Sequence, residues 1–230
     1  METFYSNTEI KLGTDVAIID QNEVIHAFAS LRIKTGEKVR LINGRGSAFI
    51  CEVLGCSKKE LVLLPSQELS ADTEYKDIKL TAAVSMLNKS SKMKLLVEKL
   101  TELGISEFIP FVSKRTAFPK MNTGSLKPSM ISALKQCGGA EDVQLREPLT
   151  FEELISVEGF DKRYFADISG SGSECGIKQG KILVVTGPEG GFDENEIFEM
   201  KKRQIIPLKL NKRILRSETA AIVAASKFLY

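Results

Sequence analysis

Hydrophobic and polar positions alternate in two different ways along the chain. In the first part, short runs of β-branched and aliphatic residues predict strands at residues 15–19, 38–42, 48–54 and 60–64. Asn43-Gly44-Arg45-Gly46 lies between two of these runs and is typical of a hairpin turn, because Asn and Gly tolerate positive φ. With a short helix expected between Glu23 and Leu31, this part is predicted to be a small β-rich domain.

From residue 77 the pattern changes to strands that alternate with helices. Strands are expected at 78–86, 105–112, 163–166 and 182–185, and helices at 93–103, 128–136, 194–203 and 218–229. This alternation favours an α/β fold with a parallel sheet and helices on both faces, in which ligands bind at the carboxyl ends of the strands. The polar stretch 66–74 is expected to link a domain at 1–72 to a domain at 73–230.

A glycine-rich segment, Thr186-Gly187-Pro188-Glu189-Gly190-Gly191-Phe192, follows the apolar run at 182–185. Asp193 comes next, and an Asp with a Glu three residues later is typical of a helix start. Glycines leave backbone groups that a ligand can approach closely. The spacing matches neither the dinucleotide fingerprint nor the phosphate loop. The pattern alone leaves open a binding site for a polar small molecule and a structural turn.

A second segment, Arg213-Ile214-Leu215-Arg216-Ser217-Glu218-Thr219-Ala220, follows about two dozen residues later. Together the two segments closely resemble the RsmE family, the ribosomal RNA uridine-N3 methyltransferases of the SPOUT class. Further segments resemble family elements in the same order: His26 to Arg32 with Gly36-Glu37-Lys38-Val39, Glu98 to Ile105, and Gln136-Cys137-Gly138. The resemblance covers essentially the whole chain.

This resemblance implies a SPOUT-type parallel sheet with a C-terminal trefoil knot, preceded by a PUA-like β-barrel RNA-binding domain. It implies S-adenosyl-L-methionine as cofactor, 16S ribosomal RNA within the small ribosomal subunit as partner, and a homodimer. The cofactor-binding residues carried over from the motifs are Gly187, Glu189, Gly190, Gly191, Leu210, Ile214, Leu215, Thr219 and Ala220. Phe165 and Ile168, at the end of an expected strand, either complete the pocket or belong to the core.

Methylation of N3 of uridine requires placement of the nitrogen in line with the methyl group and stabilisation of the uracil anion. Arg216 is the first candidate for this stabilisation and Arg213 the second. Glu218 beside them orients an arginine, caps a helix or accepts a proton, of which orientation and capping are favoured. Arg32 and Arg115, in family-like segments, are expected to contact RNA, with a surface ion pair as the alternative.

The sequence departs from the family pattern at two places. Asn211 stands where the family has Gly, and Asn is the residue that best tolerates left-handed backbone in its place. After Gln136-Cys137-Gly138 the family's Arg is missing, and an acidic stretch that includes Glu141 and Asp142 follows. Besides the methyltransferase function, two alternatives therefore stay open: a non-catalytic RNA- or ribosome-binding protein with a SPOUT fold, and a SPOUT methyltransferase that acts on another RNA.

Charge and composition narrow the class of protein. The net charge of +2 divides unevenly, since residues 1–75 contain eight basic and eleven acidic residues and the rest carries a net +5, which suits contact with RNA phosphates. Four cysteines without a Cys-x-x-Cys pair, and one histidine, predict no metal site and a reducing compartment. With no apolar run long enough for a membrane span and no secretory signal pattern, we expect a cytoplasmic protein.

Overall fold

The computed structural model describes residues 1–69, 77–117, 120, 122–170 and 179–230. The chain divides into an N-terminal unit, made of residues 1–72 and 134–142, and a C-terminal unit, made of residues 73–133 and 143–230. The expected domain boundary at residues 72–73 and the cysteine at 175 lie outside the described residues. Within the described ranges, no helix is both long and apolar enough to cross a membrane.

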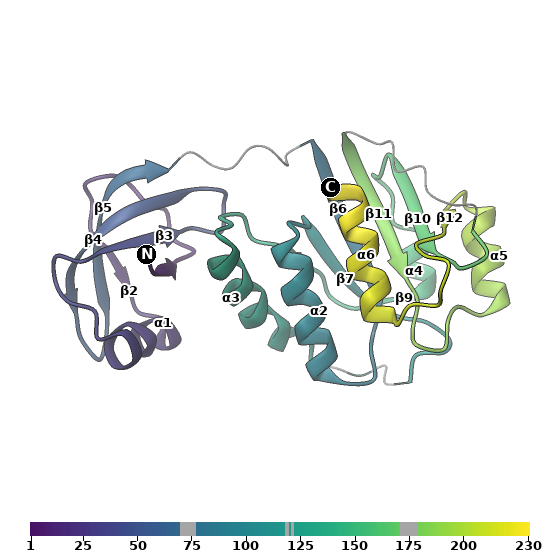
Figure 1. The fold of residues 1–230 in the computed structure, drawn as a ribbon, viewed down its shortest axis with the longest axis horizontal. Helices are drawn as coiled ribbons and strands as arrows, with labels where there is room; N and C mark the ends of the chain where they lie inside the picture. The colour runs from purple at the N-terminus through teal and green to yellow at the C-terminus, as the bar shows by residue number, and fades with distance from the viewer. Residues whose placement is uncertain (70–76, 118–119, 121, 171–178) are drawn as a thin grey trace. The chain divides into compact units, whose positions relative to one another are not determined.

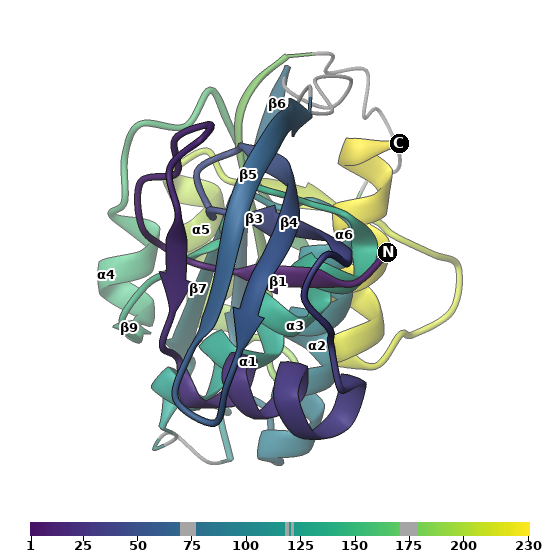
Figure 2. The ribbon, with the colours of Figure 1, turned by 90° about the vertical axis from the view of Figure 1, so that its left-hand side faces the viewer.

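The N-terminal unit is built on a curled five-stranded sheet in the order β1-β3-β4-β5-β2 (Figure 2). Its strands are β1 (Thr3–Tyr5), β2 (Val16–Ile18), β3 (Lys38–Ile42), β4 (Ala48–Cys56) and β5 (Leu61–Leu69). β1 pairs with β3 in parallel, and the other pairs are antiparallel. Alternate residues of these strands, among them Phe4, Leu41 and Leu63, are fully buried in one core.

The short helix expected in this unit is present with a change of helix type, and one other expectation needs correction. The segment from Glu23 to Leu31 is not one regular helix, because α1 (Gln21–Ile25) continues as a turn of π-helix, η1 (His26–Leu31), which ends at Arg32 in the left-handed conformation. Residues 66–69, expected in the linker, continue β5, and residues 67–69 pair with β4. Polar side chains on a strand with one solvent-facing side explain why this end of β5 resembles a linker in sequence.

The C-terminal unit contains a seven-stranded sheet in which every pair is parallel (Figure 1). Its order is β12-β10-β11-β6-β7-β8, with β9 also paired to β7. The strands are β6 (Ile78–Ser85), β7 (Glu107–Val112), β8 (Gln144–Leu145), β9 (Leu149–Thr150), β10 (Lys162–Ala166), β11 (Gly180–Thr186) and β12 (Ile206–Leu208). The helices are α2 (Ser90–Glu102), η2 (Thr123–Leu126), α3 (Lys127–Cys137), α4 (Phe151–Ile155), α5 (Glu194–Lys202) and α6 (Ser217–Leu229). Residues 134–137 at the end of α3 belong to the N-terminal unit.

Helices cover both faces of this sheet. Successive side chains of a strand point to opposite faces, so Ile182 and Val184 of β11 join the core under α2 and α6, whereas Leu183 and Val185 join the core under α4 and α5. Figure 1 shows α6 running in front of β6 and β11. The predicted α/β fold with a parallel sheet and helices on both faces is confirmed.

Candidate functional site

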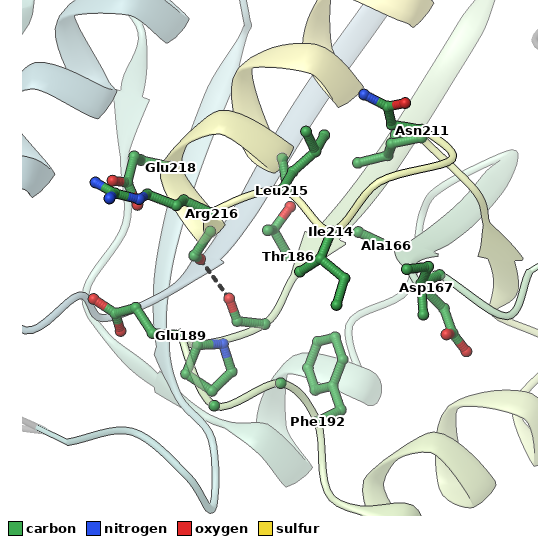
Figure 3. A pocket seen from close by; sticks show the side chains of 18 of the residues that line it. Ala166, Asp167, Thr186, Glu189, Phe192, Asn211, Ile214, Leu215, Arg216 and Glu218 are labelled. Atoms are coloured by element: carbon green, nitrogen blue, oxygen red, sulfur yellow. Dashed lines mark hydrogen bonds between the residues drawn. The ribbon is translucent and has the colours of Figure 1, made fainter.

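A cavity of about 700 Å³ lies at the carboxyl ends of three neighbouring strands, β10, β11 and β12. Ala166, Asp167 and Ile168 come from the end of β10, Leu208 is the last residue of β12, and Leu210 and Asn211 follow it. Both C-terminal motifs complete the lining (Figure 3). The volume lies in the range of small-molecule sites, and the place is the one at which open parallel sheets bind ligands.

In the glycine-rich turn, Gly191 and Gly187 lack a side chain for two different structural reasons. Gly191 has a φ of +69°, and its N–H donates to the carbonyl of Pro188 at 2.9 Å, which closes a tight turn. A Cβ added to Gly187 would lie 3.0 Å from the ring of Phe192. The absence of side chains at these positions brings bare main chain to the cavity wall.

Phe192 fixes the turn to the core of the sheet. Its ring packs against Phe165 edge to face with centroids 6.1 Å apart, and lies near Phe111 and Phe151 at 6.5 Å. Phe165 is fully buried and does not line the cavity. Phe165 and Ile168 were each expected either to complete the pocket or to belong to the core. The structure places Phe165 in the core, while Ile168 lines the cavity and is half exposed.

A polar network supports the turn from the loop after β7. Asp193 caps α5, and its carboxylate oxygen Oδ2 lies 3.1 Å from the Lys114 ammonium. This hydrogen bond to Lys114, and the one accepted from the Asn195 backbone N–H, hold the pKa of Asp193 below its usual value. Arg115 lies 3.8 Å from the same carboxylate and donates to the carbonyl of Gly190 at 3.1 Å. Arg115 thus contacts the glycine-rich turn, and the sequence did not predict this contact.

The second motif forms the opposite wall and is tied to the turn. The Asn211 side chain accepts from the backbone N–H groups of Lys212 and Arg213, so it organises the loop through its amide. The expected left-handed backbone is absent there, since Arg32 and Gln204 are the described non-glycine residues with positive φ. The Ser217 hydroxyl donates to the carbonyl of Gly187, drawn as the dashed line in Figure 3.

The two candidate arginines line the cavity with exposed side chains. Among the described residues, neither Arg213 nor Arg216 takes part in an ion pair. Arg216 stands at the N-cap of α6, where no side chain caps the helix. Both cations are therefore available to an anionic or polar group in the cavity.

The remaining predicted site residues divide between cavity and surroundings. The cavity-lining members of the predicted cofactor set are Ile168, Gly187, Glu189, Gly190, Gly191, Leu210, Ile214, Leu215 and Ala220. Thr219 is exposed on α6 outside the lining. Arg32 is exposed in the N-terminal unit.

Sequence reasoning missed two charged residues that line the cavity, Asp167 and Lys92. Lys92 belongs to the first turns of α2, which follows β6, and its ammonium lies 3.4 Å from Oε1 of Glu189. Glu189 also accepts from the backbone N–H of Asn88 at 3.2 Å. Because β6 is the neighbour of β11, the strand order brings residues after β6 to the same edge of the sheet. This neighbourhood is the signal that would have found Lys92.

The acidic stretch after Gln136-Cys137-Gly138 is part of the N-terminal unit. Within this unit, Asp142 accepts a hydrogen bond from the Tyr5 hydroxyl at 2.8 Å, and its backbone N–H donates to the carbonyl of Gly44. Burial and the Asp142 carboxylate raise the pKa of Tyr5 above its usual value. At least one of the acidic residues that set this chain apart from the family pattern therefore has a structural role.

Comparisons with known proteins agree with this site and fold. Residues 74–229 match the family model of the RNA methyltransferase domain, and residues 19–66 match that of the RNA methyltransferase PUA domain. The Ribosomal RNA small subunit methyltransferase E of Aquifex aeolicus is 29% identical over 98% of this chain and 98% of its own length. The protein of the same name from Rickettsia conorii is 24% identical over 97% of this chain and 93% of its own.

A solved structure has the same fold. The Ribosomal RNA small subunit methyltransferase E from Neisseria gonorrhoeae, bound to S-adenosyl methionine, superposes with a TM-score of 0.88 at 24% identity, over 98% of this chain and 95% of that one. The model of the RNA methyltransferase domain, which matches residues 74–229, covers more than half of the chain. The resemblance read from the motifs is thus confirmed, and the chain belongs to the RsmE family of RNA methyltransferases.

Proposed function

We propose that the protein is an S-adenosyl-L-methionine-dependent methyltransferase that methylates N3 of a uridine in 16S ribosomal RNA. The observation that carries this proposal is the cavity at the ends of β10, β11 and β12, which both family motifs line. The names of the relatives from Aquifex aeolicus and Rickettsia conorii support ribosomal RNA of the small subunit as substrate.

The lining suits the proposed cofactor. A Cβ built on Gly191 meets no atom within 4 Å, so this position borders open space that main-chain groups can share with a ligand. Leu210, Ile214 and Leu215 offer apolar contact for an adenine ring, and backbone groups of Gly187 and Gly190 offer hydrogen bonds. When bound, S-adenosylmethionine supplies an electrophilic methyl group on its sulfonium. We propose the cavity-lining members of the predicted set, and not Phe165 or Thr219, as its direct contacts.

The unpaired arginines suit the second demand of the reaction. Loss of the N3 proton places negative charge on the uracil carbonyl oxygens, and a cation aimed at them stabilises this charge. Arg216 is proposed for this role and Arg213 for support, because both line the cavity without an ion-pair partner among the described residues. The planar guanidinium also matches a carbonyl edge better than an ammonium does.

The wider assignment follows from the same family. We propose that residues 1–72 form the RNA-binding PUA-like domain, with Arg32 as an RNA contact, and residues 73–230 the methyltransferase domain. For Arg115, a contact with RNA is proposed in addition to its hydrogen bond to the carbonyl of Gly190. A cytoplasmic homodimer acting on the small ribosomal subunit is proposed with it. A trefoil knot is proposed from the family resemblance, and the hydrogen bond from Ser217, at the start of α6, to Gly187 in the turn after β11 supports it.

The test is mass spectrometry of ribosomal RNA nucleosides from cells with and without the gene. The 3-methyluridine of small-subunit RNA is expected to disappear without the protein and to return with a plasmid copy. An unchanged level would overturn the proposal. Binding of the protein to small subunits without turnover would then favour the non-catalytic binding protein, and loss of a methylated base from other RNA would favour a different substrate.

A further inference from the structure

Three charged residues from distant parts of the C-terminal unit meet at one side of the cavity. The Lys92 ammonium lies 3.4 Å from Oε1 of Glu189 and 3.9 Å from Oε1 of Glu218. Figure 3 draws Glu189, Glu218 and Arg216 on the same side of the pocket. Lys92 thereby links a glutamate of the glycine-rich turn to a glutamate of the second motif.

The second oxygen of Glu218 is the unusual atom of this group. Oε2 is buried and accepts no hydrogen bond from the residues that the structure describes, and the Glu218 side chain, which lines the cavity, is 16% exposed. No hydrogen bond joins the Glu218 carboxylate to the first backbone N–H groups of α6, so it does not cap the helix. A buried carboxylate oxygen without a donor is costly and rare in native proteins. Because Glu218 lines the cavity, its carboxylate can take its missing donor from a ligand bound there.

We propose that Glu218 accepts the N3 proton of the target uridine and that Lys92 is the residue that positions the Glu218 carboxylate. This inference rests on the proposed function, because the imide N–H of uracil is the donor that reaches Glu218. The proton passes from N3 to the carboxylate of Glu218. The electron pair left on N3 forms the new bond to the methyl carbon, and the carbon–sulfur bond breaks with its electron pair on sulfur. The proton then leaves Glu218 for water.

The geometry gives Lys92 a positioning role and not a catalytic one. Its ammonium lies 3.9 Å from Oε1 of Glu218, so it holds the carboxylate at the cavity wall and lies beside the acceptor. The ion pair with Glu189 holds the lysine from the other side, and the Lys92 side chain is 28% exposed. The positive charge of Lys92 between the carboxylates of Glu189 and Glu218 offsets the repulsion between them. Lys92 therefore connects Glu189 of the glycine-rich turn to the carboxylate proposed as proton acceptor.

The test uses small ribosomal subunits from cells that lack the gene, and single-turnover methyl transfer measured from neutral to alkaline pH. Glu218→Gln is expected to lower the rate about 10²-fold or more at neutral pH. The imide proton of uracil dissociates in alkaline solution, so the deficit is expected to shrink as the pH rises. Lys92→Met is expected to lose about tenfold with the same alkaline recovery, and Lys92→Arg to retain most of the rate.

Controls separate this inference from other roles. Glu194→Gln, at an exposed glutamate in the first turn of α5, and Lys94→Met, at an exposed lysine of α2, are expected to behave like the wild type. Calorimetric titration with S-adenosylmethionine is expected to give unchanged affinity for Glu218→Gln, and thermal melting an unchanged fold.

Each contrary outcome has one meaning. A loss of cofactor affinity in Glu218→Gln equal to its loss of rate would assign Glu218 to the cofactor and overturn the inference. A deficit that stays constant with pH would mean that Glu218 only orients Arg216, and would overturn it as well. Absence of methyl transfer by the wild type would instead overturn the proposed function.

Discussion

Arg216 combines an exposed side chain, a place in the cavity lining and a lack of ion-pair partners among the described residues. A buried or paired arginine stabilises a fold, whereas a free one at a cavity wall has its charge available for a ligand. The same position at the start of α6 fixes its backbone next to Ser217, which is bonded to the turn. The free charge is thus held at a defined place.

Substitution of Arg216 by Ala is expected to lower single-turnover methyl transfer by roughly 10²-fold with little change in cofactor affinity, since the lost interaction forms in the transition state. Lys is expected to rescue only partly, because it lacks the planar fork. Lys212→Ala, at an exposed cation of the same loop, serves as control. A parallel fall of cofactor affinity, measured by calorimetry, would move Arg216 to the cofactor site.

Gly190→Val is expected to abolish S-adenosylmethionine binding while the fold persists. A Cβ at this glycine would lie 3.5 Å from Cβ of Arg115, an ordinary contact, and no positive φ strains it. The further methyl groups would occupy the space of the ligand. Calorimetry measures the affinity and thermal melting the fold. Gly55→Val in β4 is the matched control, and unaltered cofactor affinity in a folded Gly190→Val protein would contradict the assignment.

At the scale of elements, the strands and helices with strong patterns could be predicted from sequence, and the short ones could not. The strand at 38–42 and helix α5 were expected nearly as found, because alternation and a capping box are local signals. β12 was missed because Pro207 disfavours strands in general, yet β12 is an edge strand that needs no N–H on its outer side. α4 is a five-residue helix, too short to show a helical period.

For the site too, features with a local sequence signal could be predicted, and contacts between distant segments could not. The two motifs and their shared cavity could be predicted, since each motif is continuous in sequence. The contact of Lys92 with Glu189 and Glu218 could not, because the order of strands in the sheet decides it. Arg115 was assigned to RNA for a similar reason, since the loop after β7 gives no local sign that it reaches Gly190.

Helix α5 provides a pH-dependent prediction. The pKa of Asp193 is lowered, so its charged form stabilises the folded state at pH values above the ordinary value of 3.8, and this contribution is lost as the pH falls through the lowered value. Asp193→Asn keeps a capping oxygen and loses the charge that meets Lys114. The melting temperature of the variant is expected to fall below that of wild type at neutral pH.

The difference between Asp193→Asn and wild type is expected to close in acid, because the carboxyl group is then protonated in both the folded and unfolded wild type. High salt is expected to reduce the difference too, since the Lys114 side chain that meets Asp193 is solvent-exposed. Asp15→Asn, at an exposed aspartate of the N-terminal unit, is the control. A difference independent of pH would mean that the amide itself disturbs the cap.

At the scale of the whole molecule, the two units bury separate hydrophobic cores. The N-terminal core gathers around residues such as Phe4 and Leu41, and the C-terminal unit has one core on each face of its sheet. Units with separate cores unfold as separate cooperative blocks unless a large interface couples them. A ligand that binds one folded block stabilises that block by mass action.

S-adenosylmethionine at about a hundred times its dissociation constant is therefore expected to stabilise the C-terminal unit by about 2.7 kcal/mol. Hydrogen exchange measures this by element: backbone amides of β6 and β11 are expected to gain protection, and those of β3 and β4 to stay unchanged. Gly190→Val is expected to show no gain in either unit. Equal gains in both would mean that the chain unfolds as one block.

The segment 134–142 lies in the N-terminal unit although the chain on both sides of it belongs to the C-terminal unit. Leu134, in the last turn of α3, is buried with Ile42 and Ala48 in a small cluster of the N-terminal unit. Modular proteins exchange domains by recombination at a single junction in the gene. Here a junction near residue 72 would separate the N-terminal sheet from a piece that it packs against, so the two units are expected to have been inherited together and to resist transplantation one at a time.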